Sequence, residues 1–337
     1  KRIAVILSAD NVANGKAILN ALKERGAEGK LGKADDNLKA YDGVDVADVH
    51  TAGKGLTVEE LFKAAKNADM ENLKWLYALD DLYSDDKEAL GNFNMKDIQG
   101  FSGFVKTIAR EYPDVHVRSV VSYDAFDAKG LAKLISDELT CEDASADIIY
   151  MKGERLHYNV KQADLAAQGE PSLKLDKDSV ILVLGGAQGI TPELVSQMAA
   201  EYPGRYVLVG RSARSEEAKY AGMDKDAIRK ALLQEGEPKK PADIEARVQE
   251  VFKSNQISDA LAKIEAAGGK AEYRQSDVSK AKDFKALIKA VKKDYGHIDG
   301  VIHSAGILQD KFFADKTWKS FEQVYTTKVN PLPVIME

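Results

Sequence analysis

The stretch that most constrains the fold of this 337-residue chain is an apolar run, Val180–Leu184, that leads directly into a glycine-rich turn. A continuous apolar run bounded by glycines is typical of a strand buried on both faces of a parallel sheet. The turn reads Gly185-Gly-Ala-Gln-Gly-Ile-Thr-Pro192, in which Thr191 is suited to cap a helix and Pro192 to occupy its first turn. The pattern predicts a strand–turn–helix unit of an α/β protein.

A turn of this kind is suited to a phosphate, because glycines let the backbone approach closely and a helix N-terminus offers free N–H groups. Taken alone, it leaves a dinucleotide site and a tight connection without ligand equally open. The next predicted strand, Tyr206–Val209, ends in Gly210-Arg211-Ser212. In a doubly wound sheet this strand end reaches the adenosine ribose, where Arg211 suits the 2′-phosphate of NADP and an acid would suit NAD. The sequence therefore predicts NADPH, the alternative being that Arg211 is a solvated loop residue.

Two further strand ends complete the expected site. Asp277 and Val278 follow a predicted strand at Ala271–Arg274, where Asp277 either meets the adenine or caps the next helix. Another strand, Gly300–His303, opens into small residues that would let a nicotinamide ribose approach, and we interpret His303 as a packed strand residue rather than an acid or base. The residues expected to bind the nucleotide are Gly185, Gly186, Gln188, Gly189, Ile190, Arg211, Ser212, Asp277, Val278, Ser304, Ala305 and Gly306.

The chain divides into two α/β segments. In the first, periodicity predicts strands at Ile3–Leu7, Trp75–Leu79, His116–Val121 and Asp147–Tyr150, and helices at Gly15–Arg25, Phe101–Tyr112 and Ala128–Leu139. In the second, helices are expected at Pro192–Tyr202 and Phe284–Tyr295, with two or three more in the charged stretch between Arg214 and Gly268. Ala-Arg-Glu-Tyr-Pro at 109–113 parallels Ala-Ala-Glu-Tyr-Pro at 199–203, which indicates either related halves or coincidence.

Composition narrows the class of protein. The net charge of −6 argues against a nucleic-acid surface, and no apolar run approaches the ~20 residues that cross a bilayer. The first apolar run is cut by Ser8-Ala-Asp10, too early for a secretory signal, so a buried first strand is the better interpretation. The single cysteine, Cys141, excludes an internal disulfide and fits a reducing compartment. We expect a cytoplasmic protein with no nucleic-acid, membrane or metal partner.

Five short motifs follow one another along the second half of the chain, and their order and spacing are characteristic. They are Gly185-Gly-x-x-Gly189, Gly210-Arg-Ser, Asp277-Val, His303-Ser-Ala-Gly and Thr327-Lys-Val329. Together they resemble the ketoreductase domains of modular polyketide and fatty-acid synthases, within the short-chain dehydrogenase/reductase superfamily. In the first half, segments around Phe101–Pro113, Ala132–Leu139 and Ile149–Leu156 are similar to the structural subdomain of that family. The insert Ala213–Gln256, followed by Ala260–Tyr273, resembles the ketoreductases of bacterial polyunsaturated fatty acid synthases.

The resemblance implies two Rossmann-like, doubly wound parallel-sheet halves. Residues 1–165 would form the cofactor-free structural subdomain, 166–178 a linker, and 179–337 the catalytic NADPH-binding subdomain, incomplete at its C-terminus. The implied reaction is the reduction of a 3-ketoacyl thioester carried on acyl carrier protein, among the other domains of a multidomain synthase.

The resemblance also implies roles nearer the chemistry. Lys328 matches the catalytic lysine of the family, and an ammonium beside the reacting oxygen would stabilise developing negative charge. On its own Lys328 would read as a helix-surface lysine. Asp310, in Leu308-Gln-Asp310, matches a Leu-x-Asp element associated with the 3R alcohol.

Departures from the family pattern limit these expectations. Leu184 stands where the family often has Thr, and Thr191 replaces the last glycine of the turn. The serine and tyrosine of the family lie beyond Pro331–Glu337, and the one Tyr-x-x-x-Lys spacing, Tyr83–Lys87, falls in an acidic stretch that fits a solvated helix or turn. We therefore interpret the chain as a fragment that is itself inactive. The alternative is a non-catalytic or scaffolding module that binds the cofactor.

Overall fold

The computed structural model describes residues 2–7, 12–48, 57–81, 100–141, 143, 145–163, 174–215, 218–236 and 240–337. The chain forms two compact units, one made of Lys1–Ala163 with Asp310–Phe321 and the other of Asp164–Gln309 with Glu322–Glu337. Tyr83, Lys87 and most of the expected linker, 166–173, lie outside the described residues.

The first unit is built on a seven-stranded sheet with the order β2-β1-β3-β4-β5-β6-β7. Adjacent strands are parallel up to β6, and β7 pairs with β6 in the antiparallel sense. The strands are β1 (Arg2–Leu7), β2 (Glu28–Gly32), β3 (Gly43–Asp48), β4 (Trp75–Asp81), β5 (His116–Ser122), β6 (Asp147–Met151) and β7 (Glu154–His157).

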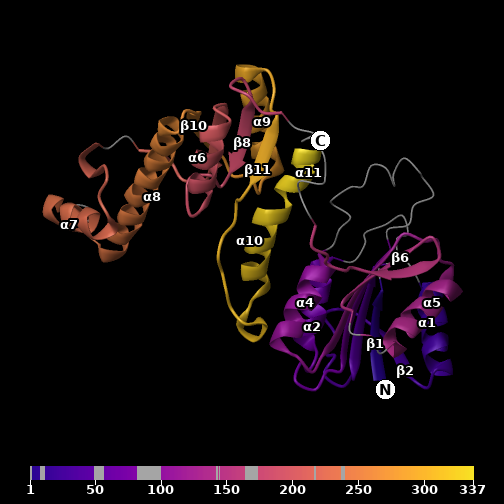
Figure 1. Cartoon of the computed structure of the whole chain (residues 1–337). Helices are drawn as coiled ribbons and strands as arrows, with labels where there is room; N and C mark the ends of the chain where they lie inside the picture. The colour runs from indigo at the N-terminus through magenta and orange to yellow at the C-terminus, as the bar shows by residue number, and fades with distance from the viewer. Residues whose placement is uncertain are drawn as a thin grey trace. The chain divides into compact units, whose positions relative to one another are not determined.

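Helices cover both faces of this sheet, as Figure 1 shows. Apolar residues of α1 and α5 pack with Val5, Leu79 and Val120 in one core cluster. On α4 the buried residues recur at helical spacing, Phe101, Phe104, Val105 and Ile108, so one stripe of the helix faces the core. The helices are α1 (Val12–Glu24), α2 (Val58–Asn67), α4 (Phe101–Glu111) and α5 (Ala128–Thr140).

The second unit is built on a four-stranded parallel sheet with the order β10-β9-β8-β11. From β8 the chain moves outward through β9 to β10, then returns to the other side of β8 as β11. The strand order therefore reverses between β8 and β11, which is the position where open α/β sheets bind ligands. The strands are β8 (Val180–Leu184), β9 (Arg205–Gly210), β10 (Lys270–Gln275) and β11 (Gly300–His303).

Alternating residues of β8 face opposite layers of helices, as period two requires. Ile181 and Val183 pack against α6 and α8, whereas Leu182 and Leu184 pack against α9 and α11. The helices of this unit are α6 (Thr191–Glu201), α7 (Lys225–Glu235), α8 (Pro241–Ala266), α9 (Ala281–Tyr295) and α11 (Pro331–Met336), while α10 (Trp318–Val329) begins in the first unit and ends in this one.

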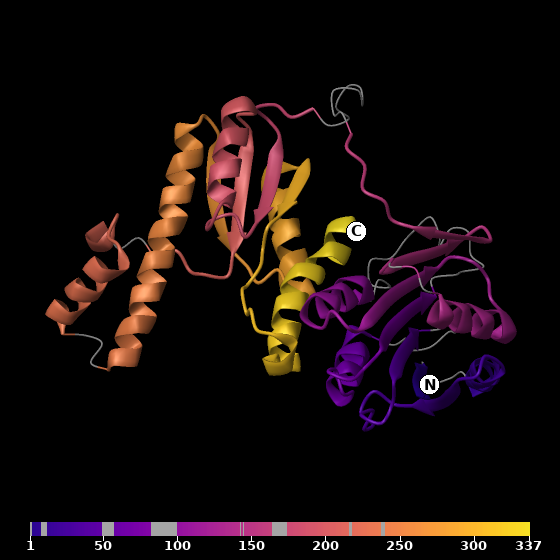
Figure 2. The ribbon, with the colours of Figure 1, turned by 60° about the horizontal axis from the view of Figure 1, so that its bottom comes forward.

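The charged insert forms a short 3-10 turn, η3 (Ala218–Tyr220), followed by α7 and the 26-residue α8. Its N-terminal part has a core of its own, in which Tyr220, Ile228, Leu232 and Val248 are buried. The C-terminal half of α8 packs on the sheet through Ile257, Leu261 and Ile264. Figure 2 shows α8 running beside the sheet with α7 on its outer side.

The segment Asp310–Phe321 packs in the first unit through an aromatic cluster. The ring of Phe62 lies 5.3 Å from Phe313, 5.6 Å from Trp318 and 5.4 Å from Phe321, centroid to centroid. The ammonium of Lys66 donates to the carbonyl oxygens of Phe313 and Ala314 at 2.5 and 2.8 Å, at a 3-10 turn, η4 (Phe313–Asp315).

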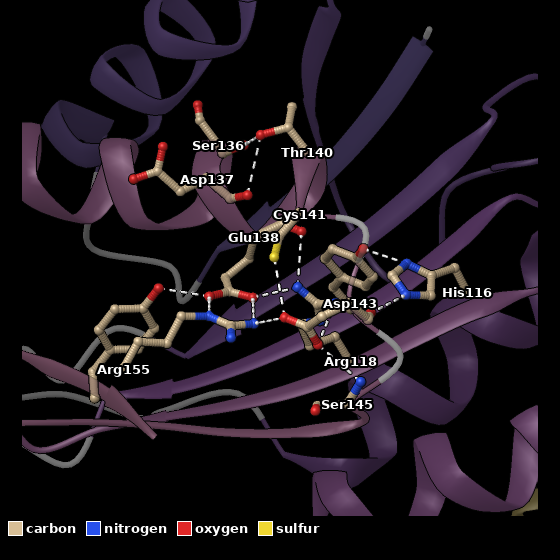
Figure 3. A network of polar contacts seen from close by, with 12 residues as sticks. His116, Arg118, Ser136, Asp137, Glu138, Thr140, Cys141, Asp143, Ser145 and Arg155 are labelled. Atoms are coloured by element: carbon tan, nitrogen blue, oxygen red, sulfur yellow. Dashed lines mark hydrogen bonds and ion pairs between the residues drawn. The ribbon is translucent and has the colours of Figure 1, made fainter. Parts of the chain in front are cut away.

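A buried ion network, drawn in Figure 3, joins β5, α5 and the β6–β7 hairpin. The carboxylate of Glu138 accepts from Arg118 at 2.5 Å, from Arg155 at 2.6 Å and from the hydroxyl of Tyr150 at 2.5 Å. Asp143 pairs with the same two arginines. Both Arg118 and Glu138 are almost fully buried, so each charge depends on the other for compensation.

Every helix and strand expected from periodicity is present, and the insert holds two α-helices as expected. Elements that were not anticipated are β2, β3, α2, β7 and α11, whereas α10 carries Lys328, for which a position on a helix was the alternative interpretation. No helix of the described residues is both long and apolar enough to cross a membrane.

Candidate functional site

A pocket of about 470 Å³ opens at the carboxyl ends of the second sheet, over the reversal in strand order. Its walls come from the ends of β8, β9, β10 and β11, from α8, and from one residue of α10. The lining residues are Gly185, Ala187, Gln188, Gly189, Val209, Gly210, Arg211, Ser212, Lys253, Ile257, Tyr273, Ser276, Asp277, Val278, Ser304, Ala305, Gly306, Ile307, Leu308 and Thr327.

The glycine turn has the geometry that its sequence predicts. Gly185 has φ +79°, and a Cβ added there would lie 2.6 Å from the Cα of Ala305, so the turn passes directly against the end of β11. Gly189 has φ +69°, and a Cβ there would meet no atom within 4 Å. The space beside Gly189 is therefore open to a ligand. Gly186 instead packs inward, because its Cβ would lie 2.6 Å from Val183.

The expected capping role of Thr191 is wrong. Ile190 is the N-cap of α6, and no side chain caps the helix there. The hydroxyl of Thr191, which is buried, donates to Ser304 Oγ at 3.0 Å, and Ser304 in turn donates to the carbonyl of Leu184 at 3.0 Å. Thr191 therefore connects the start of α6 to the ends of β8 and β11. This contact explains why a threonine can stand where the family pattern has the last glycine of the turn.

The loop that carries Arg211 is held by residues of β10. The hydroxyl of Tyr273 donates to the carbonyl of Ser212 at 2.6 Å, and the amide of Gln275 donates to the carbonyl of Arg211 at 2.9 Å. Gly210 lies close beneath this tyrosine, since a Cβ there would be 2.8 Å from its hydroxyl and would displace it. These contacts place the backbone of Arg211 and leave its exposed side chain at the pocket.

Of the two alternatives expected for Asp277, the helix cap is wrong, because Lys280 is the N-cap of α9, and the contact with adenine stays a prediction. Its carboxylate accepts from Ser279 N and Oγ at 3.2 and 2.6 Å, which closes a local turn two residues ahead of α9 rather than capping the helix. It also lines the pocket. Burial raises the pKa of Asp277, but the hydrogen bonds from Ser279 and the charge of Arg211 outweigh burial, so the pKa is lower than usual. Asp277 is therefore an anion at neutral pH.

The other end of the pocket lies near Lys328. A Cβ on Gly306 would be 3.1 Å from Lys328 Nζ, so the ammonium stands against the lining residue Gly306. His303 Nε2 donates to the carbonyl of Lys328 at 2.9 Å, which holds the end of α10 against β11. His303 Nδ1 is buried without a hydrogen-bond partner among the described residues. These contacts are those of a packed strand histidine.

The structure gathers most of the predicted binding residues around one pocket. Gly186 and Ile190 do not line it: the first is packed in the core and the second is 74% exposed. Lys328 stands beside a lining residue, and Asp310 is an exposed residue of the segment that belongs to the first unit. The lining residues that were not among the predicted binding residues are Ala187, Val209, Gly210, Lys253, Ile257, Tyr273, Ser276, Ile307, Leu308 and Thr327. Lys253 lies in a highly charged helix, where no local signal distinguishes it.

Fold and pocket define an open, doubly wound α/β unit with a ligand-sized pocket where the strand order reverses. Residues 179–337 match the family described as the KR domain. Together with the relatives described next, this match places the chain among the ketoreductase domains of type I polyketide synthases.

One subunit of the polyunsaturated fatty acid synthase of Thraustochytrium sp. is 33% identical over 243 residues, which make up 67% of this chain and 9% of that protein. Polyketide synthase PksN of Bacillus subtilis is 27% identical over 237 residues, or 69% of this chain and 4% of that protein. The chain thus spans less than a tenth of either relative. The crystal structure of an N-terminal ketoreductase from the macrolactin assembly line has the same fold, with a TM-score of 0.65, 18% identity, and coverage of 99% of this chain and 66% of that one.

Proposed function

We propose that the pocket binds NADPH. The glycine turn and the start of α6 would hold the pyrophosphate, Arg211 the 2′-phosphate, and Ser304–Gly306 would face the nicotinamide end. The residues present suit such a ligand. The space beside Gly189 is open, the cation of Arg211 stands at the pocket, and small residues form the opposite wall. NADPH, when bound, supplies a hydride.

We propose that the chain serves the reduction of a 3-ketoacyl thioester, carried on acyl carrier protein, within a polyketide or polyunsaturated fatty acid synthase. The position of Lys328 beside Gly306 carries this proposal, because it puts a positive charge at the expected nicotinamide end. That charge would stabilise the negative charge that develops on the ketone oxygen and lower the pKa of a neighbouring acid. Asp310 would belong to the element that directs formation of the 3R alcohol.

A second function is favoured by the chemistry of the lining. Tyr273 is the one tyrosine among the lining residues, its hydroxyl is already donated to Ser212, and burial raises its pKa to about 12. Tyr273 is therefore a poor proton donor to a substrate at neutral pH. We accordingly expect these 337 residues alone to bind the nucleotide without oxidising it, as a cofactor-binding module would.

Nucleotide titration tests the cofactor assignment. The chain should bind NADPH more tightly than NADH, and Arg211→Asp should weaken NADPH binding far more than NADH binding, because it sets a carboxylate against a phosphate. An equal loss for both nucleotides would contradict the assignment of Arg211.

Nucleotide consumption tests the reaction. NADPH and a 3-ketoacyl thioester are supplied to this chain and, separately, to a synthase that contains it, and the nicotinamide absorbance is followed. Reduction by the synthase that is lost in Lys328→Ala supports ketoreduction. If both samples bind NADPH tightly but neither oxidises it, the ketoreduction proposal fails and the chain acts as a non-catalytic cofactor-binding module.

A further inference from the structure

We propose that Lys253, on the insert helix α8, is a specificity-determining residue that binds the 2′-phosphate of NADPH jointly with Arg211. This inference rests on the NADPH-binding function proposed above and assigns the insert a part in the cofactor site. The inserted helix would then be a wall of the nucleotide pocket as well as an addition to the outside of the unit.

Packing places Lys253 at the pocket. Ile257, one helical turn further along α8, is 1% exposed and packs on the sheet with Ile181 and Val183. Residues four apart lie on one face of a helix, and both Lys253 and Ile257 line the pocket. Anchored at Ile257, the helix presents the exposed ammonium of Lys253 along the same face.

Hydrogen bonds tie α8 to the loop that carries Arg211. Ser254 Oγ accepts from Ser215 N at 2.8 Å and donates to Ser215 O at 2.9 Å, and Ser254 itself is 3% exposed. Arg214 Nε donates to Ser258 Oγ at 3.3 Å. The end of this loop, Arg214–Ser215, therefore lies along α8 at Ser254–Ser258, and Lys253 is the residue before Ser254. The adenosine end of the pocket thus has α8 as its neighbour.

The charges around the pocket suit a phosphate dianion. The charged lining residues are Arg211, Lys253 and Asp277. Ser279 already donates to one oxygen of Asp277, whereas neither cation has a hydrogen bond or ion pair from its side chain within the part of the chain that the structure describes. A phosphate monoester carries nearly two negative charges at pH 7, which two cations match. Arg211 offers a planar fork and Lys253 a point charge, so they would approach different oxygens.

The experiment compares dissociation constants of NADPH and NADH for the 337-residue chain and for Lys253→Gln. A lost charge-assisted contact to phosphate is expected to weaken NADPH binding about tenfold and leave NADH binding unchanged. Lys253→Arg should restore most of the NADPH affinity. The matched control is Lys263→Gln, which removes the same charge from the same helix about 15 Å away along its axis, where Lys263 pairs with Glu193.

The outcomes separate this inference from the function on which it rests. If the unaltered chain binds neither nucleotide, the proposed function fails and the inference fails with it. If the unaltered chain prefers NADPH and Lys253→Gln leaves that preference intact, only the inference fails. Equal weakening of both nucleotides, or an equal effect of Lys263→Gln, also overturns it, because the lysine would then act through the general charge of the helix.

Discussion

Gly185 and Gly189 occupy the same turn with similar positive φ angles but different surroundings. We expect Gly189→Ala to cost about 1 kcal/mol of unfolding free energy, from backbone strain alone. Gly185→Ala adds a clash with the backbone of Ala305, so its cost should be about 3 kcal/mol or more and nucleotide binding should be lost. Chemical denaturation of both variants measures the difference, and equal costs would contradict the close contact of the turn with β11.

Glu138 should make the stability of the first unit depend on pH. Burial raises the pKa of Glu138, but hydrogen bonds from Arg155, Tyr150 and Arg118 outweigh burial, so the folded pKa lies below the ordinary 4.5. A carboxyl with a lowered folded pKa stabilises the fold fully above its unfolded pKa, and this stabilisation is lost as the pH falls below about 4.5 toward the folded value.

Glu138→Gln should cost about 3–5 kcal/mol at neutral pH, because Arg118 is left buried without its partner, and should flatten the stability profile in acid. Denaturation series at neutral pH and at pH 3–5 measure both effects. Asp137→Asn is the matched control, since this neighbouring carboxylate pairs with Lys133 and Arg25 at the surface, and loss of such exposed pairs should change stability by about 1 kcal/mol or less. Glu138→Gln behaving like this control would show that the buried network is not needed for stability.

Individual site residues could be predicted from sequence where the signal was local. Gly185, Arg211 and Ser304 each follow an apolar strand, so the edge of a parallel sheet brings them together. Lys253 could not be found in this way, because its place at the pocket depends on the packing of Ile257 and Ser254 against distant segments. Thr191 was misread because its hydroxyl has a tertiary partner, Ser304, that the local capping pattern does not reveal.

At the scale of elements, Phe313 and its neighbour Phe312 provide a matched test of the aromatic cluster. Phe313 is 4% exposed and Phe312 is 73% exposed. Phe313→Ala should therefore cost about 3–5 kcal/mol, whereas Phe312→Ala should change stability by about 0.5 kcal/mol or less. Thermal unfolding of the two variants gives the comparison, and similar effects would show that the cluster with Phe62 contributes little.

The elements that periodicity missed are mostly those without an apolar signal. The edge strands β2 (Glu28–Gly32) and β7 (Glu154–His157) are largely polar and depend on the neighbouring strand for their place. In contrast, α2 was detectable. Thr57 precedes it and Glu60 follows three residues later, a capping box that the structure contains and whose Thr57 N–H donates to Glu60 at 2.9 Å.

For the whole molecule, separate cores in the two units predict two unfolding transitions in calorimetry. NADPH at a hundredfold excess over its dissociation constant should stabilise the second unit by about 2.7 kcal/mol and leave the first unchanged. Arg211→Asp serves as the control and should abolish most of the shift. If both transitions rise together with nucleotide, the two units unfold as one cooperative body.

The path of residues 310–321 also limits how such a chain can be recombined with its relatives. Because Phe313, Trp318 and Phe321 pack against Phe62, the first unit draws part of its core from far along the chain. A chimaera joined at residue 174 would take residues 310–321 from one parent and the helix that carries Phe62 from the other. A functional exchange between synthases should therefore succeed only when Phe62 and residues 310–321 come from the same parent. The segment to be exchanged is then larger than residues 179–337 alone.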